Sequence, residues 1–168
     1  MNHSIQHHYQ DLITLFNQCF ELEYNTRLVK GGDEPIYLPA DETRPYHAIY
    51  FANGFFSSAL HECAHWFIAG ESRRQQIDFG YWYEPDGRTI EQQRLFQRLE
   101  VKPQAIECML SLACGFRFQV SIDNLNGHEV DTEGFKEAVK QQVHHYTEQG
   151  LPKRAERFRK VLSDFYFG

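Results

Sequence analysis

Apolar residues recur at helical spacing in the N-terminal part of this chain, which predicts two helices there. The first helix has one apolar face, formed by Tyr9, Leu12, Ile13, Phe16, Cys19 and Phe20. Residues 55–67 contain neither proline nor glycine, and Asn53-Gly54 interrupts the apolar run that precedes them. Their apolar stripe consists of Phe56, Leu60, Cys63 and Phe67. The second helix is therefore predicted over 55–67.

The C-terminal half contains further helical patterns. One helix is predicted over 90–99, and a second is predicted to begin near Pro103, because proline is accepted in the first turn of a helix. The apolar stripe of this second helix is Ile106, Met109, Leu110 and Ala113. Two closing helices follow, one starting near Asp131 or Thr132 and ending at Gly150, the other covering 152–165.

Short strands are predicted between the helices. Residues 36–38 lie between two prolines, and residues 48–52 form a longer apolar run that leads towards the helix over 55–67. Residues 78–83 are aromatic and predict a third extended segment, followed by a turn at 85–87. These elements together predict an α+β fold with a small mixed sheet packed by several helices.

Composition limits the size and the setting of the molecule. With 168 residues, of which 42% are hydrophobic, one domain over residues 1–168 is expected. No stretch approaches the about 18 consecutive apolar residues of a membrane span, and no signal pattern opens the chain, so a cytoplasmic protein without membrane attachment is expected. The formal charge of −6 argues against general nucleic-acid binding. The four cysteines form no C-x-x-C pair and are expected to be reduced.

The motif His61-Glu62-Cys63-Ala64-His65 carries the strongest chemical signal. Two histidines four residues apart on a helix project from one face, and this arrangement clamps a divalent metal ion. Apolar residues flank both histidines, so burial is expected, and a metal ion would satisfy both rings. The metal site is therefore predicted on a central buried helix.

A third ligand is needed, because two histidines hold a divalent ion weakly. Three glutamates are candidates. Glu71 lies shortly after the motif, where some metalloproteases place their third ligand. Glu100 and Glu107 lie at the start and on the flank of the helix predicted from Pro103. Sequence spacing does not choose among the three.

Several unusual blocks occur in one order along the chain. They are Asp33–Pro39, Ser58–Trp66, Ala69-Gly70, Asp78–Tyr83, Pro85–Arg88 and Glu100–Ala105. Together they resemble the bacterial elongation factor P hydroxylase family over most of the chain. The order of the blocks makes this resemblance more specific than the histidine motif alone.

The resemblance implies hydroxylation of the elongation factor P lysine that already carries a β-lysyl group. It also implies a non-haem Fe(II) site in which His61 and His65 are joined by Glu100 as the carboxylate. Glu71 is the main departure, since the family does not need an acid at that position. Two imidazoles and one carboxylate leave positions on Fe(II) open for dioxygen, which is the expected co-substrate.

Glu62 separates two chemical interpretations of the motif. In a zinc-dependent hydrolase, either a peptidase or a nuclease, Glu62 would serve as the general base. In a hydroxylase it would orient a histidine or contact the cationic substrate. The hydroxylase is the preferred hypothesis, and the zinc hydrolase is the alternative.

Substrate-binding residues are predicted around the aromatic segment. Asp78 and Asp86 could receive the two amino groups of a β-lysyl-lysine arm, and the side walls would be Tyr81, Trp82 and Tyr83. A basic group near the C-terminus is a candidate docking surface for an acidic partner such as elongation factor P. It consists of Lys153, Arg154, Arg157, Arg159 and Lys160, with Arg73 and Arg74 elsewhere.

Overall fold

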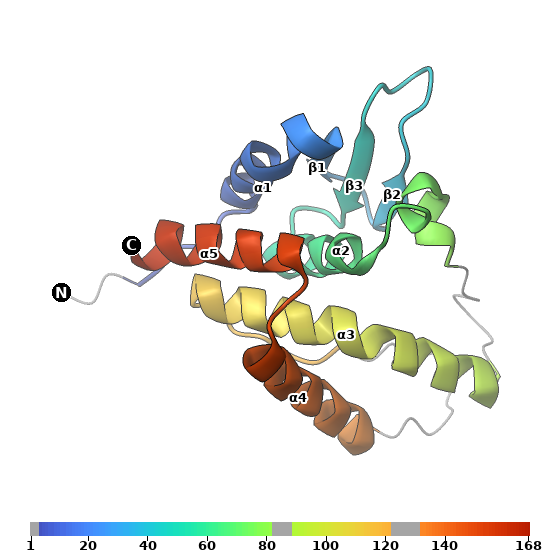
Figure 1. The fold of residues 1–168 in the computed structure, drawn as a ribbon, viewed down its shortest axis with the longest axis vertical. Helices are drawn as coiled ribbons and strands as arrows, with labels where there is room; N and C mark the ends of the chain where they lie inside the picture. Colours follow the sequence, from blue (N-terminus) through green and yellow to red (C-terminus); the bar gives the residue numbers. More distant parts are fainter. Residues whose placement is uncertain (1–3, 82–88, 122–131) are drawn as a thin grey trace.

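The computed structural model of this protein describes residues 4–81, 89–121 and 132–168. In these ranges a small sheet lies at one end of a group of α-helices (Figure 1). The helices are α1 (Tyr9–Tyr24), α2 (Phe56–Ile68), α3 (Ile90–Cys114), α4 (Thr132–Gln149) and α5 (Lys153–Phe167). The strands are β1 (Thr26–Lys30), β2 (Ile36–Leu38) and β3 (His47–Phe51). Two short 3-10 helices are η1 (Arg73–Gln75) and η2 (Ile77–Gly80).

The sheet is mixed, as predicted, with strand order β1-β3-β2. β1 runs parallel to β3, with Thr26 opposite His47, and β2 runs antiparallel to β3, with Ile36 opposite Tyr50. The α+β class is therefore confirmed. Figure 1 shows the sheet and α1 on one side of α2, and α3 followed by α4 on the other.

Helix α2 lies at the centre because most of its surface is apolar. Its seven buried residues include all four members of the predicted apolar stripe. They are Phe56, Ala59, Leu60, Cys63, Ala64, Trp66 and Phe67. It packs against β3, α1, α3 and α5. No side chain caps its N-terminus. Tertiary burial of the apolar faces, more than end capping, therefore stabilises this helix.

Strand β1 was not predicted. Its five residues alternate between buried Thr26 and Leu28 and outward charged Arg27, with Lys30 at its exposed end. Helix α1 ends at Asn25 in the left-handed conformation, which turns the chain directly into this strand. A five-residue alternation with two charges is too weak a pattern to separate from a loop, and pairing with β3 decides it.

The two helices predicted on either side of Pro103 form one helix, α3. Pro103 lacks an N–H, so the carbonyl of Leu99 loses its usual helical donor. The helix nevertheless continues: Pro103 is buried, and α3 packs against α2, α4 and α5. Its ends are well defined by a capping box between Thr89 and Gln92 and by left-handed Gly115.

The strand predicted over 78–83 is wrong in the residues that the structure describes. Asp78 and Phe79 have φ of 47° and 60° and belong to η2, while residues 82–88, including the predicted turn, lie outside the described ranges. Phe79 is buried and stacks on Tyr37, with ring centroids 4.2 Å apart. Anchoring of this ring favours a tight turn over an extended strand.

An aromatic cluster joins α1, α2 and α5. Phe20 is fully buried, and its ring lies 5.1 Å from Trp66, 5.6 Å from Phe67 and 6.1 Å from Phe158. Edge-to-face and tilted ring pairs add to the free energy of apolar burial. Because Trp66 and Phe67 follow the second histidine directly, this cluster also holds the end of the helix that carries the motif.

We expect Phe20→Ala to lower the free energy of unfolding by about 3–5 kcal/mol, because it removes a buried ring from this cluster. Leu22→Ala, on the same helix, is the matched control, since Leu22 is 100% exposed. Urea denaturation followed by circular dichroism measures both. Equal midpoints for the two variants would contradict the role given to the aromatic cluster.

Candidate metal centre

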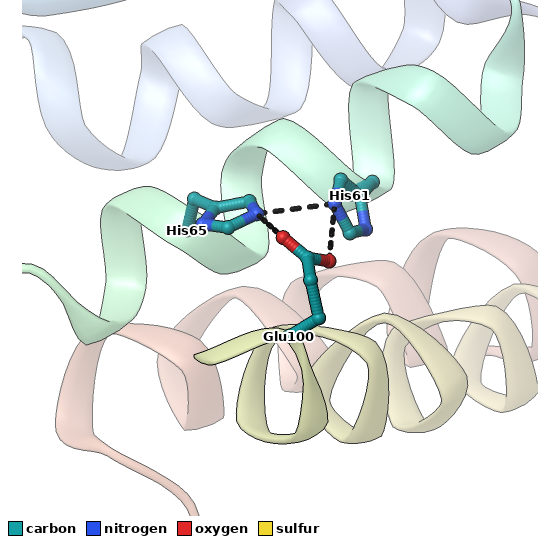
Figure 2. Close-up of side chains that lie close together, drawn as sticks. All are labelled: His61, His65 and Glu100. Carbon is teal, nitrogen blue, oxygen red and sulfur yellow. Dashed lines mark hydrogen bonds and ion pairs between the residues drawn. The ribbon is translucent and has the colours of Figure 1, made fainter. Parts of the chain in front are cut away.

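Helices α2 and α3 together bring three metal-ligating side chains to one point. His61 and His65 lie one turn apart on α2, and Glu100 reaches them from α3 (Figure 2). The carboxylate oxygens of Glu100 lie 3.2 Å from Nε2 of His61 and 3.0 Å from Nε2 of His65. The two Nε2 atoms are 3.1 Å apart. All three donor atoms fall within 4.8 Å of one another, close enough to hold one metal ion.

The site is buried on the α3 side and partly open on the α2 side. Glu100 is 5% exposed, whereas the side chains of His61 and His65 are 22% and 17% exposed. Both histidines are intermediate in exposure, so their expected burial is only partial. Partial exposure suits a catalytic metal, which must keep coordination positions open for small molecules.

The electrostatics of this group already resemble those of a cation site. Burial by itself lowers the pKa of His61, but the carboxylates of Glu100 and Glu107 raise it well above its usual value. Burial likewise raises the pKa of Glu100, and the two histidines more than reverse this, so that it lies well below its usual value. Glu100 is thus an ionised carboxylate that requires positive charge around it.

The donor set fits a divalent transition metal. Two imidazole nitrogens and one carboxylate oxygen suit Fe(II), Mn(II) or Zn(II), and three protein ligands leave further positions for other molecules. A purely structural zinc site usually takes four protein ligands rich in cysteine. Cys63, in the same motif, is buried with the apolar stripe.

The other two candidates for the third ligand lie elsewhere. Glu107 contacts the opposite edge of the His61 ring, with its Oε1 2.7 Å from Nδ1. Glu71 is exposed in the turn after α2 and is not in the group that brings together His61, His65 and Glu100. The geometry therefore favours Glu100, although the sequence left all three open.

Glu62 lies beside the metal group on α2. Burial raises its pKa, the two histidines oppose this, and the neighbouring carboxylates of Glu100 and Asp78 raise it further. Asp78 is therefore close enough to act on the same region. Glu62 and Asp78 are therefore a pair of acidic side chains next to the candidate metal site.

Asp78 is held in place from the sheet. The backbone N–H of Tyr37 donates to its Oδ1 at 2.9 Å, and the Tyr37 hydroxyl donates to the carbonyl of Arg74 at 2.6 Å. Tyr81 faces the guanidinium of Arg73, whose Cζ lies 4.3 Å from the ring centroid. Sequence reasoning did not identify Tyr37, because a tyrosine in a short strand has no chemical signature.

The predicted basic docking group divides into different environments. Arg154 donates to the carbonyls of Trp66, Phe67 and Ala69 at the C-terminal end of α2 and covers the Trp66 ring. Burial and the nearby Arg74 lower the pKa of Arg154 to about 10.

Arg154 therefore stabilises the C-terminal end of α2. Two more members of the group pair with nearby acids: Arg157 with Glu23 and Arg159 with Glu156. Lys153 and Lys160 remain exposed. The docking surface stays a prediction with fewer free charges than the sequence suggested.

The substrate-binding candidates fall partly inside and partly outside the described residues. Trp82, Tyr83 and Asp86 lie outside the described residues. Asp78 and Tyr81, which are described, come from the turn formed by η2 and the residue after it. All four cysteines are free, in agreement with the prediction of reduced thiols.

The fold and the site define an α+β protein with two histidines and one carboxylate arranged on facing helices as in mononuclear non-haem metal enzymes. A family model described as elongation factor P hydroxylase matches residues 15–168. The elongation factor P lysine hydroxylase of Haemophilus influenzae is 64% identical over 162 residues, which cover 96% of this chain and 91% of the relative. The chain therefore belongs to the elongation factor P hydroxylase family.

We expect metal affinity to fall as the pH falls. In the metal-free protein the raised pKa keeps a proton on His61 near neutral pH, and a metal ion must displace it from Nε2. Calorimetric titration with Mn(II) near neutral pH, in buffers of different ionisation enthalpy, should show proton release on binding. Binding without proton release and without pH dependence would contradict this charge arrangement.

Proposed function

We propose that this protein hydroxylates the β-lysylated lysine of elongation factor P, with Fe(II) as cofactor and dioxygen as co-substrate. The observation that carries the proposal is the group of His61, His65 and Glu100 in a chain that closely resembles an elongation factor P lysine hydroxylase. Membership of this family favours the hydroxylase over the zinc hydrolase that the histidine motif alone would allow.

Iron is the metal that this chemistry requires. Fe(II) held by two histidines and one carboxylate supplies the activation of dioxygen that hydroxylation of an unactivated carbon needs. His61 and His65 would bind through Nε2, since these atoms face one another and the carboxylate of Glu100. The buried carboxylate of Glu100 would neutralise part of the metal charge and would leave the exposed side of the histidines available to substrate.

Glu62 fits a role in substrate binding in this reaction. Hydroxylation by iron and dioxygen does not need the general base that a hydrolase takes from this position. The β-lysylated side chain carries positively charged amino groups. The carboxylates of Glu62 and Asp78 lie close enough to act on one another beside the metal group, and they would attract such a side chain.

The predicted substrate pocket would include this acidic pair. Asp78 would accept one ammonium group, and Asp86 would accept the second. Tyr81 and Tyr83 would form its aromatic walls, and Tyr81 already stacks against a guanidinium. A positively charged group over a tyrosine ring at this position is the kind of contact that the lysyl arm would make.

A translation factor as substrate implies that the protein works in the cytoplasm. None of the helices in the described ranges combines the length and the hydropathy needed to span a bilayer. The net negative charge of the chain is consistent with a protein substrate that presents a cationic side chain.

We expect the Fe(II)-loaded protein to add one oxygen atom to β-lysylated elongation factor P under air, as measured by intact-protein mass spectrometry. The zinc-loaded protein should add none, because zinc does not activate dioxygen. Glu100→Ala should add none, because it lacks the carboxylate ligand. Glu71→Ala is the matched control and should keep the activity. A wild-type protein that fails to add oxygen when a reductant is supplied would refute the proposed function.

We expect Asp78→Asn to raise KM for β-lysylated elongation factor P about tenfold, with a much smaller effect on kcat. The amide can still accept the N–H of Tyr37, so mainly the charge is lost. Asp41→Asn is the matched control, since Asp41 also accepts backbone N–H groups in a turn but is exposed in the loop between β2 and β3. Equal KM values for both variants would argue against substrate contact by Asp78.

A further inference from the structure

His61 is held between two carboxylates of one helix. Glu100 and Glu107 are seven residues apart on α3, about two helical turns, so both face α2. Glu100 Oε2 lies 3.2 Å from Nε2 of the His61 ring, and Glu107 Oε1 lies 2.7 Å from Nδ1. The ring therefore has one carboxylate at each of its two nitrogens.

The contact with Glu107 assigns different roles to these nitrogens. An ionised carboxylate only accepts hydrogen bonds, so the short 2.7 Å contact requires a hydrogen on Nδ1 of His61. When a metal ion displaces the second proton of His61, the neutral imidazole keeps one hydrogen, on Nδ1, and has its lone pair on Nε2. Nε2 is the atom that faces His65 and Glu100. Glu107 thus selects the tautomer that presents a ligand atom to the metal group.

His65 has no comparable support. Across the described ranges, no side chain or carbonyl group hydrogen-bonds to Nδ1 of His65. The two histidines of the motif are equivalent in the sequence but not in the structure. The orientation of the candidate ligands therefore depends on His61 and on Glu107, its partner across the interface between α2 and α3.

The burial of Glu107 is explained by its contact with His61. It is 7% exposed, and a buried carboxylate is costly unless it is paired. Within the described part of the chain, His61 is the hydrogen-bond partner of this carboxylate. Glu107 does not bind the metal ion directly, because the His61 ring lies between its carboxylate and the three converging donor atoms.

We propose that Glu107 is the positioning residue of the metal centre, which orients His61 and fixes its Nε2 as the ligand atom. This inference rests on the proposed metal-dependent function. A carboxylate behind a ligating histidine also makes the ring a stronger electron donor, so its loss should weaken metal binding as well as disorder the ring.

Cobalt(II) titration followed by visible absorption tests the proposal without turnover. We expect Glu107→Ala to weaken cobalt affinity about 10- to 100-fold. Glu107→Gln should lose less, because its amide oxygen still accepts the Nδ1 hydrogen. Ser111→Ala is the matched control: Ser111 is also buried, lies one turn further along α3, and its hydroxyl donates to the backbone carbonyl of Glu107. This variant should bind cobalt like the wild type.

Nitrogen-15 NMR of the zinc-loaded protein supplies a second measurement. The wild type should show one histidine with a hydrogen-bonded Nδ1–H, assigned to His61 by its loss in His61→Ala. Glu107→Gln should retain this hydrogen on Nδ1 with a weakened bond. Glu107→Ala should lose the signal of the hydrogen-bonded Nδ1–H. A variant that is only less stable, but still folded, would keep this signal.

The outcomes separate this inference from the proposed function. Wild-type cobalt affinity and an unchanged NMR signal in Glu107→Ala would overturn the inference while leaving hydroxylation intact. A protein that fails to hydroxylate elongation factor P but shows the graded loss of cobalt affinity would refute the function and support the inference. A wild type that binds no cobalt would overturn both.

Discussion

The packing of α2 against α3 is the interaction on which the rest of the structure depends. It places the buried carboxylate of Glu100 against His61 and His65 and creates a position where positive charge is required. Neither helix forms this site alone, because two histidines bind a metal weakly and a lone buried carboxylate is unstable. The stability of the interface and the chemistry of the site therefore have a common origin.

The remaining elements keep α2 in place. The aromatic cluster around Phe20 and Trp66 fixes the apolar side of the helix, and Arg154 satisfies the carbonyls at its C-terminal end. These contacts bring α1 and α5 to the helix from opposite ends of the chain. A site assembled from residues on helices is held more rigidly than one formed by loops, which suits a metal centre.

The acidic pair beside the candidate metal site, Glu62 and Asp78, depends on a strained turn for the position of Asp78. Asp78 and Phe79 adopt left-handed backbone conformations, which cost free energy for residues other than glycine and persist only where surrounding contacts impose them. Tyr37 supplies these contacts through its backbone, its hydroxyl group and its ring. The central helix is thus flanked by α3, which provides the candidate third ligand Glu100, and by a turn that brings the carboxyl group of Asp78.

The sequence by itself determined the α+β class, the helix that carries the motif and the spacing of His61 and His65, because these follow from local periodicity. It also narrowed the third ligand to three glutamates. Only the tertiary structure separated Glu100 from Glu107, since both lie on one helix and their roles depend on which edge of the His61 ring each meets. Continuity of α3 through Pro103, the pairing of β1 and the turn at Asp78 were likewise decided by packing, because long-range contacts overrule weak local preferences.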